Sequence, residues 1–116
     1  MIPPHATDTT LAGRPPASSP LERDRVLATL RAHRAILIRE FGVRELALFG
    51  SLARNEAAHE SDIDILVDFP DPASAQQYFG LQFYLEDLLG RPVDLVTERA
   101  LRPELRPYVE REAIHV

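Results

Sequence analysis

Apolar residues recur at helical spacing in two long segments of the chain. The first stripe comprises Val26, Leu30, His33, Leu37 and Phe41. Ser19 as N-cap, Pro20 at the first helical position and Glu22 three residues after the cap form a capping box. Gly42 is suited to ending the helix. One continuous helix is therefore predicted between Pro20 and Gly42, with His33 at the core boundary and not in a catalytic role.

The second stripe comprises Tyr78, Leu81, Leu85 and Leu88. Asp71 as cap and Pro72 at the first helical position are predicted to begin this helix, and Gly90 to end it. Further along, Pro103 and Pro107 break the chain into short helical pieces.

Three shorter segments have the pattern of β-strands. Glu45–Phe49 and Pro92–Val96 are short apolar runs, and Asp62–Phe69 alternates between apolar and acidic positions except at Leu66. Its apolar and acidic side chains fall on opposite faces: Ile63, Ile65, Val67 and Phe69 against Asp62, Asp64 and Asp68. Between the first two strands, Ser51–Ala58 is predicted to form one or two helical turns.

The predicted order is helix, strand, short helix, strand, helix, strand, helix. Gly50 and Ser51 follow the first strand, and Asp62 and Asp64 begin the second, so a shared site requires these two strands to be antiparallel. The second and third strands are joined through a helix, which predicts a parallel pair with a right-handed connection. We therefore expect an α+β fold, a small mixed β-sheet with helices mainly on one face.

Composition limits the function classes. A chain of 116 residues suits one compact domain, which we place at residues 19–116. The Pro- and Thr-rich segment 1–18 is expected to be a disordered tail, or the result of a start codon placed too far upstream. The formal charge of −5 argues against direct nucleic-acid binding. Cysteine and lysine are absent, which excludes thiolate and lysine chemistry. No apolar run has membrane-spanning length, so a cytoplasmic protein is expected.

Acidic residues on two of the predicted strands indicate a metal site. Asp62 and Asp64 share one strand face, at roughly 6.6 Å between Cα atoms, and can bridge hard cations. Asp94 on the third strand is the candidate third ligand. Asp68 is interpreted as the rim of the site and not as a ligand, His59 as a solvated loop residue and Glu60 as a surface charge. Gly50 and Ser51 can offer backbone N–H groups and a hydroxyl to phosphate oxygens. An Asp-x-Asp pair alone is most often a solvated strand edge, and Gly-Ser an ordinary turn; together they indicate phosphoryl or nucleotidyl transfer.

These motifs resemble a known superfamily. Leu48-Phe49-Gly50-Ser51-Leu52-Ala53-Arg54, a gap of ten residues after Ser51, and Asp62-Ile63-Asp64 are similar to the DNA polymerase β-type nucleotidyltransferases. The similarity extends over about residues 22–116 and includes Arg91-Pro92-Val93-Asp94-Leu95-Val96. It also includes the closing segment from Leu105 to Glu110-Arg111-Glu112-Ala113. It is greatest to the minimal nucleotidyltransferases of prokaryotes, among them the antitoxins of HEPN–minimal nucleotidyltransferase toxin–antitoxin pairs. The implied fold is the polymerase β palm-like nucleotidyltransferase fold.

The resemblance also implies roles. Asp62 and Asp64 would each ligate Mg²⁺, and Asp94 would join the ion nearer the attacking hydroxyl and assist its deprotonation. Gly50 and Ser51 would hold the triphosphate of ATP, with two Mg²⁺ ions in all. Arg54 is a second phosphate contact or, equally well, a surface arginine that caps the short helix. Where the family usually has glycine after this arginine, the chain has Asn55, which also tolerates positive φ.

The expected reaction is attack of an acceptor hydroxyl on the α-phosphorus of ATP with release of pyrophosphate. A chain of 116 residues with acidic charge leaves no room to hold a polynucleotide, so the acceptor is expected to belong to a partner. The resemblance suggests a tyrosine of a HEPN-domain toxin, which added AMP would silence. The alternatives are a non-catalytic antitoxin that acts by binding alone, a small-molecule nucleotidyltransferase and a structural domain. No membrane partner is expected, and a homo-oligomer stays open.

Overall fold

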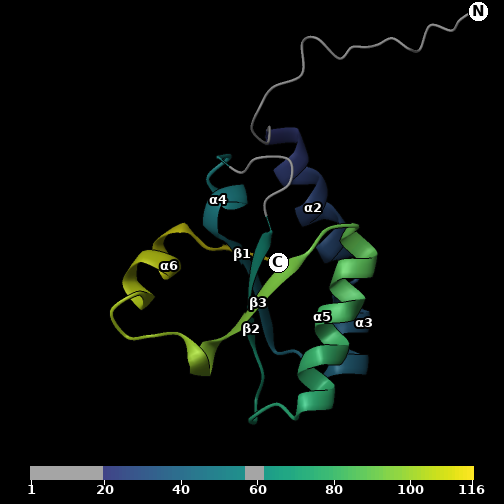
Figure 1. Ribbon diagram of the computed structural model, residues 1–116. Coiled ribbons are helices and arrows are strands. Elements are labelled where there is room, and N and C mark those ends of the chain that lie inside the picture. The colour runs from purple at the N-terminus through teal and green to yellow at the C-terminus, as the bar shows by residue number, and fades with distance from the viewer. Residues whose placement is uncertain (1–19, 57–61) are drawn as a thin grey trace, which may run out of the picture.

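The computed structural model describes residues 20–56 and 62–116, which form a four-stranded sheet flanked by helices (Figure 1). The elements are α2 (Pro20–Ala32), α3 (Arg34–Phe41), β1 (Glu45–Phe49), α4 (Gly50–Ala53), β2 (Ile63–Asp68), α5 (Ala75–Leu89), β3 (Val93–Thr97), the 3₁₀ helix η1 (Glu98–Ala100), α6 (Arg106–Glu112) and β4 (Ile114–His115). The predicted tail at 1–18 and the cap at Ser19 lie outside the described residues.

The sheet has the order β3-β2-β1-β4. The pairing of β1 with β2 is antiparallel and that of β2 with β3 is parallel, which confirms both predictions. β4 pairs antiparallel with β1 and was not predicted. It has only two residues, Ile114 and His115, so it is too short for an alternating pattern to show in the sequence.

Two apolar clusters cover the two faces of the sheet. On one face α2, α3 and α5 pack against the strands, and α6 lies on the other (Figure 1). The larger cluster includes the fully buried Leu30, Leu37, Leu48, Ile63, Ile65, Val67, Leu81 and Leu85. The smaller one comprises Ala47, Leu66, Leu101 and Val109. The predicted α+β fold with helices mainly on one face is therefore confirmed, and α6 is the exception.

The first long helix is interrupted, so the prediction of one continuous helix is wrong. His33 has φ −106° and ψ 10° and separates α2 from α3, and its N–H donates to the carbonyl of Leu30 three residues earlier. Leu30 and Leu37 both remain in the core across the break. Because the apolar stripe continues, its spacing cannot reveal the interruption. His33 is half-buried, and its ring contacts the ring of Tyr84.

The second long helix begins later than predicted. Its N-cap is Ser74, whose hydroxyl accepts a hydrogen bond from the Gln77 N–H, so Asp71 and Pro72 precede the helix instead of beginning it. The chain holds two cap signals three residues apart, and the buried Phe69 places the first of them in the turn after β2. Gly90 follows the last helical residue, as predicted.

Asn55 shapes the turn that follows α4. It has φ +61° and lies outside the helix at the position that Schellman motifs give to glycine. The Glu56 N–H donates to the carbonyl of Ser51, and the Asn55 N–H to that of Leu52, which is the hydrogen-bond pattern of that motif. The expectation that asparagine preserves the turn is confirmed. Of Ser51–Ala58, one helical turn is observed, and residues 57–58 lie outside the described part.

In residues 20–56 and 62–116, no helix is long and apolar enough to cross a membrane.

We expect Asn55→Ala to lower the free energy of unfolding by about 1 kcal/mol, because alanine is strained at positive φ, a region that asparagine adopts more readily than other residues with a Cβ. Asn55→Gly should match or exceed the wild-type stability, since glycine adopts this φ freely and removes a buried Oδ1 that lacks a hydrogen-bond partner among the described residues. Chemical denaturation of the three proteins measures both changes. Equal losses in the two variants would show that the side chain, and not the φ angle, matters at this position.

Candidate active site

The strand register brings the predicted acidic residues to one end of the sheet. Asp64 of β2 lies opposite Phe49 of β1 and beside Asp94 of β3. Residues in direct register on parallel strands present their side chains to the same face. Asp62 lies two residues before Asp64, and both Asp62 and Asp94 are exposed while Asp64 is half-buried. Since Phe49 immediately precedes Gly50, the acidic residues and the glycine–serine bend share this end.

Asp64 and Gly50 are in direct contact. Gly50 has φ +77°, and a Cβ built on it would lie only 2.1 Å from the Asp64 Oδ2 atom. Only glycine fits between the β1–α4 bend and this carboxylate, which explains the residue type in chemical terms. The structure thus places the candidate metal ligand against the backbone of the candidate phosphate cradle, which we define as Gly50, Ser51 and Arg54.

Repulsion between acidic side chains is built into the site. Burial first, and then the neighbouring charges of Asp94, Asp62 and Glu112 in that order, raise the pKa of Asp64 to about 6, while Arg54 lowers it. Burial and the three other carboxylates therefore outweigh the one nearby cation, Arg54. Carboxylate oxygens are the ligands that Mg²⁺ prefers, so the donor set fits the predicted ion.

The acidic side chains are not gathered into a closed cage. Among the described residues, no group of three or more acidic or histidine side chains is arranged closely enough to enclose a metal ion as it stands. Like charges repel when no cation lies between them. The backbone register therefore provides the positions, and the side chains of Asp62 and Asp94, both exposed, are free to turn inward.

Glu112 is a site residue that the sequence did not reveal. Its Oε2 atom accepts a hydrogen bond from the Gly50 N–H at 2.9 Å, and its Oε1 atom accepts one from the Arg54 Nη1 atom at 2.7 Å. Glu112 ends α6, far from the cradle in sequence, and β4 brings it close by pairing with β1 at Ala47 and Leu48. In the sequence, Glu112 belongs to the closing segment that resembles the family, but the resemblance gave that segment no role in the site.

Arg54 caps α4 and also faces the site. Its backbone N–H donates to the Gly50 carbonyl, and its guanidinium binds Glu112 at 2.7 Å and Glu56 at 3.0 Å. The structure shows Arg54 as the cap of the short helix, and its role as a phosphate contact stays a prediction. The hydrogen bonds that Arg54 donates to Glu112 and then to Glu56 raise its pKa above the ordinary value.

Asp68 lies apart from the other acidic residues, as predicted. It is at the far end of β2, in register with Glu45, and pairs with the Arg44 Nε atom at 2.8 Å. His59 and Glu60, which were interpreted as loop and surface residues, lie outside the described part of the chain.

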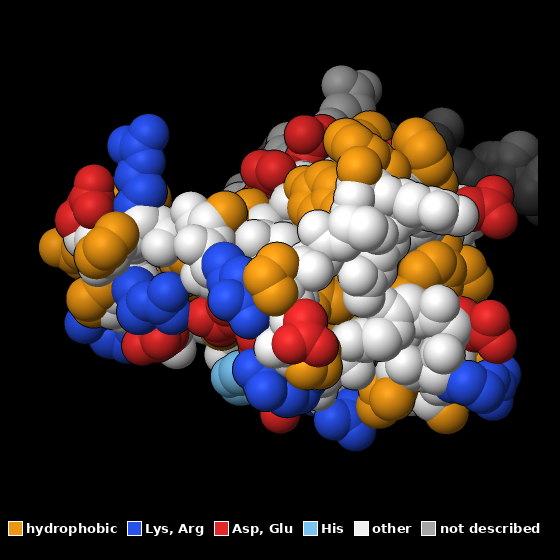
Figure 2. Space-filling model, turned by 90° about the horizontal axis from the view of Figure 1, so that it is seen from below, with side chains coloured by type: hydrophobic (Ala, Val, Ile, Leu, Met, Phe, Trp, Pro, Cys, Tyr) orange, Lys and Arg blue, Asp and Glu red, His pale blue; other side chains and the backbone are white. Residues whose placement is uncertain are grey.

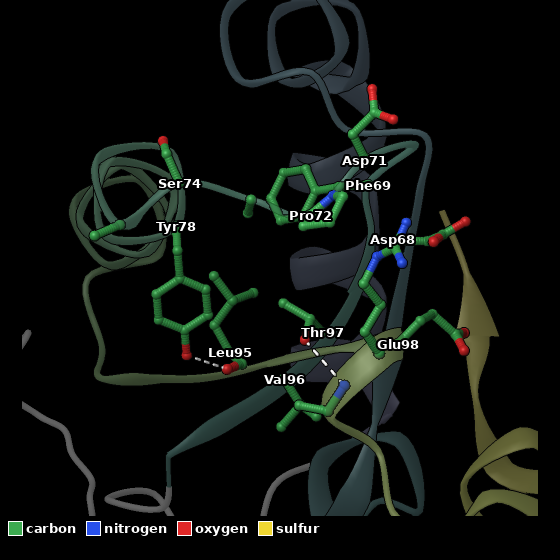
Figure 3. A pocket seen from close by; sticks show the side chains of 14 residues that line it. Asp68, Phe69, Asp71, Pro72, Ser74, Tyr78, Leu95, Val96, Thr97 and Glu98 are labelled. Atoms are coloured by element: carbon green, nitrogen blue, oxygen red, sulfur yellow. Dashed lines mark hydrogen bonds between the residues drawn. The ribbon is translucent and has the colours of Figure 1, made fainter.

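A cavity of about 430 Å³ lies at this far end of the sheet and not at the acidic end. Figure 3 shows Phe69, Pro72, Tyr78 and Leu95 around it, with the Tyr78 hydroxyl donating to the Leu95 carbonyl. The cavity contains none of the predicted catalytic residues.

In the view from below, acidic and arginine side chains are interspersed over the lobe of η1 and α6 (Figure 2). Arg106, for example, pairs with Glu98 at 2.7 Å.

Known proteins are similar to this chain in sequence and in fold. The model of the nucleotidyltransferase domain family matches residues 30–116. The chain belongs to this family. The nucleotidyltransferase is 43% identical over 96 residues to the protein adenylyltransferase MntA of Thermococcus cleftensis. The aligned region covers 83% of this chain and 97% of that protein.

Two solved structures extend the comparison. A protein provisionally identified as a minimal nucleotidyltransferase superposes with a TM-score of 0.71 at 39% identity, covering 84% of this chain and 98% of its own. A toxin–antitoxin crystal structure with AMP-PNP has a TM-score of 0.59 at 25% identity, covering 80% of this chain and 70% of the other. The predicted family, fold and enzyme class are confirmed: the chain is a minimal nucleotidyltransferase.

We expect Asp64→Asn to stabilise the fold of the nucleotidyltransferase above pH 6 in the presence of a chelator. A carboxyl whose pKa rises from 3.8 to about 6 on folding favours the neutral form, so stability is present at low pH and is lost as the pH rises toward 6. After a discount for solvent screening, the gain at pH 8 should be about 1 kcal/mol, or roughly 4 °C in Tm. Thermal melts at pH 4 and 8 measure it, and the difference should vanish at pH 4.

Asp68→Asn is the matched control, because Asp68 lies on the same strand but is paired with Arg44. It should bring no gain at pH 8. A gain of equal size in both variants would mean that overall charge, and not the crowding at Asp64, causes the effect.

Proposed function

We propose that this minimal nucleotidyltransferase transfers AMP from ATP to a tyrosine hydroxyl of a partner HEPN-domain toxin and thereby acts as an antitoxin. One observation carries the proposal: the Asp64 carboxylate lies against the Gly50 backbone and beside Asp94 in the sheet. Nucleotidyl transfer needs a metal site in contact with a phosphate cradle, because oxygens of the triphosphate must coordinate the metal.

The relatives support the choice of nucleotide and partner. The Thermococcus cleftensis relative is named a protein adenylyltransferase, which indicates a protein acceptor and AMP. The toxin–antitoxin structure with AMP-PNP supports ATP as donor and a toxin as partner. The HEPN domain and the tyrosine come from the resemblance of the sequence motifs to the antitoxin branch of the family.

Each residue has a proposed task. Asp62, Asp64 and Asp94 would together hold two Mg²⁺ ions, which would supply charge neutralisation at the phosphates. Gly50, through its N–H, and Ser51, through its hydroxyl, orient the triphosphate so that the α-phosphorus faces the acceptor.

Asp94 is an exposed residue of the edge strand β3 and accepts the proton of the incoming hydroxyl. The bond from the acceptor oxygen to the α-phosphorus forms as the bond to the β-phosphate oxygen breaks, and pyrophosphate leaves. Positioning and charge stabilisation account for the acceleration.

We expect Asp62→Ala and Asp64→Ala each to reduce transfer at least 1000-fold, on the order of losing a principal electrostatic contact in the transition state. The assay combines the protein, α-labelled ATP, Mg²⁺ and the candidate HEPN protein, and reads the intact mass of the partner. Asp68→Asn is the matched control and should keep the wild-type rate, because its carboxylate lies at the other end of β2. Wild-type transfer by either alanine variant would reject the assignment.

The hydrogen bond from the Gly50 N–H to Glu112 favours one alternative, a non-catalytic antitoxin, because the cradle is already engaged. The same mixture separates the two functions. Neutralisation of the toxin by Asp62→Ala, with no gain in the mass of the partner, would show that binding alone suffices. A small-molecule acceptor would instead appear as labelled product without any labelled protein.

A further inference from the structure

The side chain of Glu112 bridges two donors of the phosphate cradle. Its two carboxylate oxygens accept separate hydrogen bonds, one from the Gly50 N–H at 2.9 Å and one from the Arg54 guanidinium at 2.7 Å. Both are donors to an anion, and both distances are those of strong bonds. The side chain of Glu112 is only 24% exposed, so it is held in place and does not sample solvent freely.

A nucleotide and Glu112 compete for the same positions. A backbone N–H makes one strong hydrogen bond, so the Gly50 N–H cannot donate fully to the carboxylate and to a phosphate oxygen together. A carboxylate and a triphosphate also repel each other at this distance. Three other carboxylates already surround Asp64 or contact it, which makes the addition of a phosphate beside Glu112 still less favourable.

We propose that Glu112 is a built-in anionic competitor that occupies the phosphate position in the free protein and that the triphosphate must displace. This assignment rests on the proposed function, which gives Gly50 and Arg54 to the nucleotide. In the free protein Glu112 keeps the Gly50 bend and Arg54 in the arrangement that a phosphate needs. Glu112 therefore sets the affinity for the nucleotide, while the acidic residues of β2 and β3 carry the chemistry.

Displacement requires little rearrangement. Glu112 is the last residue of α6, and the backbone on both sides of it is fixed by other bonds. The Ala113 N–H donates to the Val109 carbonyl, and Ile114 pairs with Leu48 of β1. A rotation of the Glu112 side chain can free the cradle while α6 and β4 stay in place.

Glu112→Gln tests this competition. Glutamine keeps the size of the side chain but removes the charge, and its NH₂ group cannot accept a bond from Arg54. Isothermal titration with Mg²⁺-tripolyphosphate and with Mg²⁺-AMP-PNP measures binding to the cradle, the first probe without any contribution from a base. We expect the variant to bind both probes roughly tenfold more tightly than the wild type.

Glu110→Gln is the matched control. Glu110 lies on the same helix and faces Arg106 at 3.5 Å, so its variant removes the same charge without touching the cradle. Its affinities should stay within about twofold of the wild type. An equal gain in both variants would assign the effect to overall charge and overturn the proposal.

Unchanged or weaker binding by Glu112→Gln also overturns the proposal, and weaker binding would make Glu112 a positioning residue for Arg54. If circular dichroism shows that the glutamine variant does not fold, Glu112→Asp replaces it. The aspartate side chain is one methylene shorter and cannot bridge both donors, so this variant should also bind the probes more tightly than the wild type.

The same variants distinguish a failure of the competitor proposal from a failure of the proposed function. Loss of transfer in Asp62→Ala, with no gain in Glu112→Gln, leaves the enzyme assignment intact and rejects only the competitor. Wild-type transfer by Asp62→Ala rejects the enzyme assignment, while the tripolyphosphate titration still decides whether Glu112 occupies a phosphate position.

Discussion

The contact between the Asp64 carboxylate and the Gly50 backbone constrains the rest of the site. It leaves no space for a side chain at position 50, and it requires β1 to end where β2 begins. Antiparallel pairing of these strands meets that requirement, and the parallel pairing of β3 then adds Asp94 beside Asp64. The candidate metal ligands Asp64 and Asp94 and the candidate phosphate cradle are thus placed by strand register, a property of the whole sheet.

The same arrangement works against the stability of the fold. Four carboxylates lie near one another, and burial together with the repulsion from the other three raises the pKa of Asp64. The residues that alternate with Asp64 offset this cost, because Ile63 and Ile65 are fully buried, and burying each such side chain contributes about 1.5–3 kcal/mol. One face of β2 therefore lies wholly in the larger core, while the other carries the charges together with the buried Leu66. A cation or a partner that relieves the repulsion would also stabilise the fold.

Local patterns predicted most of the fold, and they failed where tertiary contacts decide. Strand β2 and the helix ends at Gly42 and Gly90 follow from alternation and from glycine. The break at His33 leaves the apolar stripe unchanged and so leaves no mark in the spacing. Both Asp71 and Ser74 are suitable N-caps for α5. The burial of Phe69 decides between them, and Ser74 is the cap.

The candidate site divides in the same way. Its acidic residues and its glycine–serine bend each occupy a short sequence motif, so the metal and phosphate chemistry that they suggest can be recognised before the fold is known. Glu112 is different, because an acidic residue on a short, mostly exposed helix resembles a solvated surface charge. Its meaning comes from β4, a two-residue strand whose pairing with β1 carries the end of α6 to the cradle. A ligand-like anion that belongs to the chain itself is therefore visible only in three dimensions, where it engages the same N–H and guanidinium that a phosphate would need.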